Sequence, residues 1–158
     1  MTEITHKQLC TKTATWLQNK NFAYRIVITE LKTFAGEIPD NIGFNGSGGS
    51  ILIECKISLA DFNKDKEKHF RKYEEMGMGD ERYFCAPKGI LKPEIIPEKW
   101  GLIEYENNRF YTTKESEHFG ADKRKELIMV VSAMRRLEIA TCVFVRQDNP
   151  HTDGIIDE

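Results

Sequence analysis

Alternation of apolar and polar side chains over residues 50–57 predicts a β-strand, because successive side chains of a strand point to opposite faces. One face carries Ile51, Ile53, Cys55 and Ile57. We interpret this face as core. The other face carries Leu52, Glu54 and Lys56. Alone, the Glu-x-Lys pair would be an ordinary ion pair on a solvated strand, so its meaning depends on the neighbouring segment.

The preceding residues, 36–44, predict a second strand with a carboxylate in an apolar row. Its period-two register comprises Ile38, Asp40, Ile42 and Phe44. A carboxylate in such a position is costly unless a cation or hydrogen bonds compensate it. The turn-forming residues 45–50, Asn-Gly-Ser-Gly-Gly-Ser, then connect the two strands. A β-hairpin that brings Asp40 beside Glu54 is therefore predicted.

Other apolar patterns predict three helices and further strands. Helical spacing occurs over residues 5–19, 58–76 and 121–141, with Thr5 as a cap of the first helix and Ser58 and Asp61 as a capping box of the second. The apolar stripe of the second helix is Phe62, His69, Phe70, Tyr73 and Met76, and that of the third is Leu127, Val130, Val131, Met134 and Leu137. We expect the third helix to pack on the sheet. Strands are predicted over 24–29, 82–86, 100–106 and 109–112.

The composition indicates one domain of ordinary size. The chain has 158 residues, 40% of them hydrophobic, and a formal net charge of −2. We expect a single domain over residues 1–146 and a loose, polar, acidic tail over 147–158. The near-neutral charge excludes a globally basic nucleic-acid binder but leaves local patches open.

The cysteines and the hydropathy of the chain indicate the cellular compartment of the protein. Four scattered cysteines, Cys10, Cys55, Cys85 and Cys142, form no Cys-x-x-Cys pair and are typical of buried free thiols in a reducing environment. The N-terminus is polar, and no apolar run approaches about 18 residues. A cytoplasmic protein without a membrane contact is therefore expected.

The predicted hairpin contains the donor groups of a divalent-metal site. Asp40 and Glu54, with the main-chain carbonyl of Cys55 and water, would make an oxygen-only site suited to Mg²⁺, for which Mn²⁺ is a substitute. Lys56 would orient or deprotonate an attacking water, or offset negative charge in the transition state.

These residues resemble the signature of the PD-(D/E)xK nuclease superfamily, here Pro39-Asp40 followed by Glu54-Cys55-Lys56. The likeness covers roughly residues 6–105 and is similar to small DNA-repair and phage-type members. It implies an α/β fold of the restriction-endonuclease-like type, with the core order α-β-β-β-α-β, a mixed four-stranded central sheet, flanking helices and a C-terminal helix. It also implies a further acid before the signature Asp. Glu30 matches that position, and Glu37 is the rival.

Basic residues on the predicted second helix are candidates for DNA contact. They are Lys64, Lys68, Arg71 and Lys72. A phosphate backbone lying along this stripe would follow the proposed metal site. Asp65, Glu67, Glu74 and Glu75 neutralise much of the stripe, so a solvated helix face is the alternative. His6 and His69 are further candidates for acid–base chemistry, although most such histidines are structural.

The resemblance implies a metal-dependent DNA nuclease that hydrolyses phosphodiester bonds through a metal-bound water. Asp40, Glu54, Glu30 and the Cys55 carbonyl would hold the metal. The resemblance implies a role in DNA repair or recombination, or in a phage or mobile-element context. The choice of DNA rather than RNA as the substrate also rests on the resemblance alone. A homodimer stays open, because nucleases of this class often pair subunits. The alternatives are a non-catalytic nucleic-acid-binding or scaffold protein on the same fold, and a hydrolase of small phosphoesters.

Overall fold

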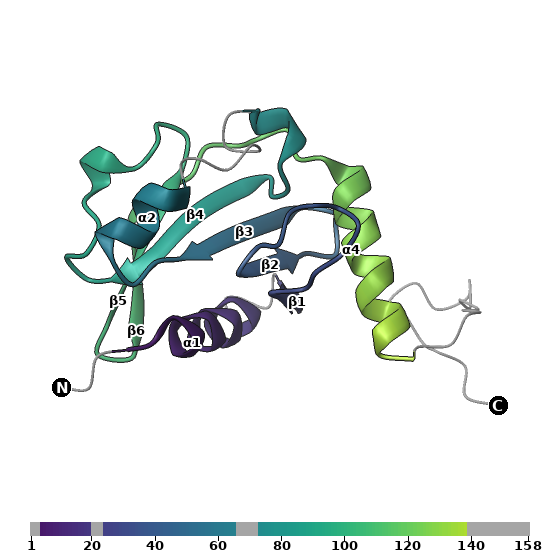
Figure 1. Ribbon diagram of the computed structural model, residues 1–158, viewed down its shortest axis with the longest axis horizontal. Coiled ribbons are helices and arrows are strands. Elements are labelled where there is room, and N and C mark those ends of the chain that lie inside the picture. The colour runs from purple at the N-terminus through teal and green to yellow at the C-terminus, as the bar shows by residue number, and fades with distance from the viewer. Residues whose placement is uncertain (1–3, 20–23, 66–72, 139–158) are drawn as a thin grey trace.

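The computed structural model describes residues 4–19, 24–65 and 73–138 (Figure 1). Its helices are α1 (His6–Asn19), α2 (Leu59–Asp65) and α4 (Lys123–Arg136), with 3₁₀ turns at Glu74–Met76 and Pro93–Ile95. Its strands are β1 (Ile26–Thr29), β2 (Asn41–Phe44), β3 (Ser50–Cys55), β4 (Glu81–Pro87), β5 (Gly101–Glu106) and β6 (Arg109–Lys114). The predicted α/β class is confirmed.

The strands form one mixed sheet in the order β1-β2-β3-β4-β5-β6. β3, β4 and β5 run parallel, and the other neighbouring pairs are antiparallel. The described sheet has six strands, so the expected four-stranded sheet was wrong in number. The difference arises because β5 and β6 form a hairpin through Asn107 and Asn108, both at positive φ, which extends the sheet beyond β4.

The elements up to β4 follow the order α1-β1-β2-β3-α2-β4. Two predicted helix starts are present. The Thr5 hydroxyl accepts a hydrogen bond from the Gln8 backbone amide, and the Ser58 hydroxyl accepts one from the amide of Asp61. Side-chain oxygens at these positions satisfy amides that have no partner within the helix. The predicted hairpin also forms, because β2 pairs antiparallel with β3.

Each face of the sheet supports its own hydrophobic core. Ile51, Ile53 and Cys55 of β3 face α1, where Leu9 and Leu17 cover them. Leu52 faces the opposite core, which contains Phe62 of α2 and Met129 of α4. Figure 1 shows α1 and α2 on opposite sides of the sheet. Because both faces are covered, Glu54 and Lys56 of the second face are buried rather than solvated.

Two predicted helices differ from the structure. The predicted helix over 58–76 is described as α2 over Leu59–Asp65, residues 66–72 lie outside the described residues, and Glu74–Met76 is a 3₁₀ turn with Tyr73 and Met76 exposed. In α4 the predicted apolar stripe was wrong in part, since Leu127 and Leu137 are 63% and 72% exposed. Met129 is the helix's buried apolar residue, with Val130 and Ala133 packed beside it. The predicted tail lies outside the described residues.

A polar network attaches the start of α4 to the sheet. The buried Glu126 accepts hydrogen bonds from the Ser50 hydroxyl at 2.6 Å, the Gly79 amide at 2.8 Å and Lys123 at 2.9 Å. Lys123 also pairs with Asp80. The buried Glu126 fixes the side of α4 that faces the sheet, and Leu127 and Val131 of the predicted stripe are exposed.

Candidate functional site

Asp40 lies beside Glu54 at the edge of the hairpin. Asn41 is opposite Ile53 in the β2–β3 register, so the preceding Asp40 stands next to Glu54. The Oδ2 atom of Asp40 accepts a hydrogen bond from the Cys55 amide at 2.8 Å. Burial and the neighbouring charge of Glu54 raise the pKa of Asp40 to about 6, against the lowering effect of the Cys55 amide, His6 and Lys56. The negative charge of Glu54 therefore disfavours ionisation of the Asp40 carboxyl group.

Lys56 is a buried cation among acids. Its Nζ atom lies 3.4 Å from Glu54 Oε2 and 3.2 Å from Asp65 Oδ1, and all three side chains are buried. Burial alone would lower the pKa of Lys56, but the charges of Glu54, Asp65 and Asp40 outweigh it, so the pKa is raised. The side chain therefore stays an ammonium ion at neutral pH. This favours charge stabilisation over a role as a general base.

Asp65 is a site residue that the sequence pattern did not assign. It is the last residue of α2 and is 1% exposed. By sequence it belongs with the acids that neutralise a solvated helix face. Its spacing of three residues from Phe62 places both on one helix side, the buried one. That spacing was the available signal, but helical periodicity alone does not say that a lysine of the adjoining strand lies there.

A second group of donors meets Asp40 from α1. The Nε2 atom of His6 lies 3.3 Å from Asp40 Oδ2, and the Sγ atom of Cys10, one turn along the helix, lies 3.6 Å from His6 Nδ1. Ligand atoms of His6, Cys10, Glu30 and Asp40 all lie within 4.8 Å of one another. The resemblance placed Glu30 with Asp40, and the four-residue spacing of His6 and Cys10 places both on one side of α1. The meeting of the two pairs depends on the pairing of β1 with β2 and on the packing of α1.

The two rival acids lie in different surroundings. Glu30 follows β1 directly, at a positive φ of 48°, and is an exposed member of the group around Asp40. Glu37 is buried, and its Oε2 atom accepts a hydrogen bond from the Met78 amide at 2.9 Å. Glu37 therefore tethers the β1–β2 loop to the segment before β4, whereas Glu30 adjoins the predicted signature.

Asp40 belongs to two candidate sets of metal donors. The set expected from the sequence is oxygen-only and comprises Asp40, Glu54 and the carbonyl of Cys55, donor types that suit Mg²⁺. The other is His6, Cys10, Glu30 and Asp40. The Cys55 thiol and burial raise the pKa of the Cys10 thiol, so Cys10 stays protonated and is a poor ligand. The remaining imidazole and carboxylates suit Mn²⁺.

The predicted DNA-binding stripe is described only at Lys64, an exposed residue of α2. Lys68, Arg71 and Lys72 lie outside the described residues, as does His69. Within the described residues, Cys10, Cys55 and Cys85 are buried free thiols, which agrees with the prediction, and no helix has the length and apolarity that a membrane crossing requires.

No protein-family model and no curated protein sequence matches the chain. Among solved structures, the fold is similar to that of the SPO1766 protein of unknown function from Silicibacter pomeroyi. The TM-score is 0.65 and the identity 21%, over 87% of this chain and 92% of that chain. At this identity the likeness shows a shared fold alone.

Proposed function

We propose that the protein is a metal-dependent deoxyribonuclease of the PD-(D/E)xK type, on a restriction-endonuclease-like fold. The observation that carries the proposal is the convergence of Asp40, Glu54 and Lys56. The amide of Cys55, between Glu54 and Lys56, fixes Asp40 at 2.8 Å, and the Lys56 ammonium lies 3.4 Å from Glu54. The pairing of β2 with β3 thus brings the three signature side chains together.

Mg²⁺ or Mn²⁺ would be held by Asp40 and Glu54, with the Cys55 carbonyl, and with Glu30 and His6 on the other side of Asp40. The neighbouring carboxylates support this, because burial and the charge of Glu54 raise the pKa of Asp40, and a bound cation would offset both effects. When bound, such an ion polarises a phosphoryl oxygen and makes water a better nucleophile.

The protein's own residues would complete the chemistry. Lys56, kept charged by its acidic neighbours, would hold the attacking water or stabilise negative charge that develops on the phosphoryl group. Asp65, at 3.2 Å, would position the Lys56 ammonium. Asp40 would be positioned in turn by the Cys55 amide. DNA as the substrate, and a role in repair, recombination or a phage context, rest on the resemblance of the signature.

The test is cleavage of single-stranded, duplex and branched DNA with Mg²⁺ or Mn²⁺ by the wild type and by Glu54→Gln and Lys56→Met variants. Both variants are expected to lose metal-dependent cutting. Glu94→Gln and Lys92→Met are the matched controls, since both residues are exposed around the 3₁₀ turn at Pro93–Ile95. They are expected to cut like the wild type.

Binding measurements separate the alternatives. Metal binding by calorimetry without cleavage of any DNA would redirect the search to small phosphodiesters. DNA binding that Glu54→Gln leaves unchanged, without metal-dependent turnover, would replace the nuclease by a non-catalytic nucleic-acid-binding protein. Cutting that persists in Glu54→Gln at the wild-type rate would overturn the assignment of the site.

A further inference from the structure

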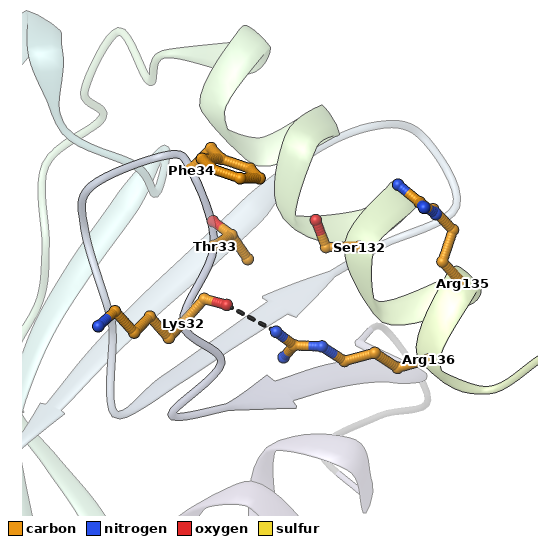
Figure 2. Close-up of a pocket in the computed structure, with 6 residues that line it drawn as sticks. All are labelled: Lys32, Thr33, Phe34, Ser132, Arg135 and Arg136. Atoms are coloured by element: carbon orange, nitrogen blue, oxygen red, sulfur yellow. Dashed lines mark hydrogen bonds between the residues drawn. The ribbon is translucent and has the colours of Figure 1, made fainter.

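A groove of about 550 Å³ lies between the β1–β2 loop and α4 (Figure 2). Its lining is Lys32, Thr33, Phe34, Ser132, Arg135 and Arg136. The loop contributes one cation, a hydroxyl and an aromatic ring, and the helix contributes two guanidinium groups and a hydroxyl. This composition is unlike the hydrophobic lining of a typical small-molecule pocket.

The loop side of the groove is held in place by several contacts. The amide of Glu30 donates to the Pro39 carbonyl at 3.2 Å, which closes the base of the loop. Arg136 Nη2 donates to the Lys32 carbonyl at 2.9 Å, which joins the loop to the C-terminal turn of α4, as Figure 2 shows. Ala35 is buried. The groove is therefore formed before any ligand arrives, which reduces the entropy cost of binding.

Phe34 is fully exposed although the loop around it is anchored. Its ring lies beside α4 in Figure 2, while the amine of Lys32 and the guanidinium of Arg135 lie at the two outer sides of the groove. Positive groups flanking an exposed aromatic ring are typical of surfaces that bind single-stranded nucleic acid. The cations contact phosphates, and the ring stacks on an unpaired base.

The loop also links the groove to the candidate site. It begins at Glu30 and ends at Asp40, both members of the metal-ligand group. A nucleic-acid strand bound in the groove would therefore contact the same loop whose two ends provide the carboxylates of Glu30 and Asp40. A duplex fits the observations less well, because its bases are stacked on one another and are not available to Phe34.

We infer that this groove binds a single-stranded segment of DNA, with phosphates at Arg135 and Arg136 and a base stacked on Phe34. The inference rests on the proposed function, since it names how the substrate strand is held. The site residues and the groove residues do not overlap, so each can be tested without altering the other.

The experiment is fluorescence anisotropy of a fluorescein-labelled oligothymidylate with the full chain in EDTA, which prevents metal-dependent cleavage. Phe34→Ala is expected to weaken binding by about 5- to 150-fold, the loss of one stacked base, and Phe34→Tyr is expected to bind like the wild type. The double variant Arg135→Gln with Arg136→Gln is expected to reduce the slope of log affinity against log salt by roughly 0.7 for each phosphate that is no longer neutralised. Leu127→Ala, an exposed residue of the same helix, is the control.

No binding by the folded wild type, or equal binding by Phe34→Ala and the wild type, overturns the inference. Preference for a hairpin duplex that the groove variants bind equally well also overturns it. These results leave the proposed function standing if the wild type still cuts DNA in the presence of metal. Conversely, if the groove variants weaken binding but the wild type never cuts DNA, the inferred binding site is supported and the proposed nuclease activity is overturned.

Discussion

Asp40 accepts a hydrogen bond from the backbone amide of Cys55, with its Oδ2 atom 2.8 Å from that nitrogen. Cys55 lies between Glu54 and Lys56, so one contact across the hairpin fixes the first acid of the signature against the other two residues. A side chain anchored to a strand backbone moves little, which is the condition for a preorganised site. The same contact makes Asp40 the residue on which the two donor sets meet.

The first prediction concerns Asp40 and pH. Its pKa is raised to about 6 from 3.8 in the folded protein, so the folded state binds more protons between these values and loses stability as the pH rises through them. This loss of stability is absent below pH 3.8 and complete above pH 6. Asp40→Asn stays neutral and keeps an acceptor for the Cys55 amide.

In EDTA at pH 7, the free energy of unfolding of Asp40→Asn is therefore expected to exceed that of the wild type by at most about 3 kcal/mol. The difference is expected to vanish near pH 4. Urea denaturation at both pH values measures it. Equal stability of the two proteins at pH 7 would show that the surroundings of Asp40 do not disfavour its ionised form.

The second prediction concerns Lys56, whose ammonium separates two buried carboxylates. Lys56→Met leaves Glu54 and Asp65 without this charge and is expected to lower the free energy of unfolding by about 3–5 kcal/mol. Adding Asp65→Asn is expected to restore part of the loss. Lys92→Met, at an exposed position, serves as the control in the same urea titrations. A loss in Lys56→Met no larger than in this control would contradict the buried ion pairs.

The third prediction concerns the choice of metal. His6 adds an imidazole to carboxylate donors, and imidazole suits Mn²⁺ better than Mg²⁺. His6→Asn is expected to weaken Mn²⁺ binding by about 10- to 100-fold with a smaller change for Mg²⁺, whereas Glu54→Gln is expected to weaken both. Titration calorimetry with each metal checks this, and His118→Asn, at an exposed position, is the control. Unchanged Mn²⁺ affinity in His6→Asn would assign His6 a positioning role only.

The fourth prediction concerns the attachment of α4 through Glu126. Glu126→Ala removes the acceptor of the Ser50 hydroxyl and of the Gly79 amide. The Ser50 hydroxyl can still donate to Asp80 Oδ2 at 3.1 Å, so the expected destabilisation is about 1–3 kcal/mol, for the Gly79 amide left without this acceptor. Glu126→Gln keeps an acceptor oxygen and is expected to lose less. Thermal or urea unfolding of the two variants makes the comparison, and equal losses would mean that the charge, rather than the hydrogen bonds, attaches the helix.

Local pattern determined much of the fold. The alternation around Glu54, the Gly-rich turn and the caps at Thr5 and Ser58 specify strand, hairpin and helix starts through backbone geometry, which depends on near neighbours in the chain. For the same reason the sequence placed Asp40 beside Glu54, since both directly adjoin the last pair of the hairpin register, Asn41 and Ile53. The proposal of a nuclease begins from that placement.

Other features depend on contacts between residues far apart in sequence. The approach of His6 to Asp40, of Asp65 to Lys56 and of Glu126 to Ser50 requires helices to pack on particular edges of the sheet. Periodicity shows which residues share a helix side but not which neighbour that side meets. Leu127 and Leu137 of α4 are exposed for this reason, because burying Glu126 in a hydrogen-bond network fixes the helix rotation, while Val130 packs on the core. The sequence alone thus determined the elements and the signature, and tertiary packing decided which other side chains surround it.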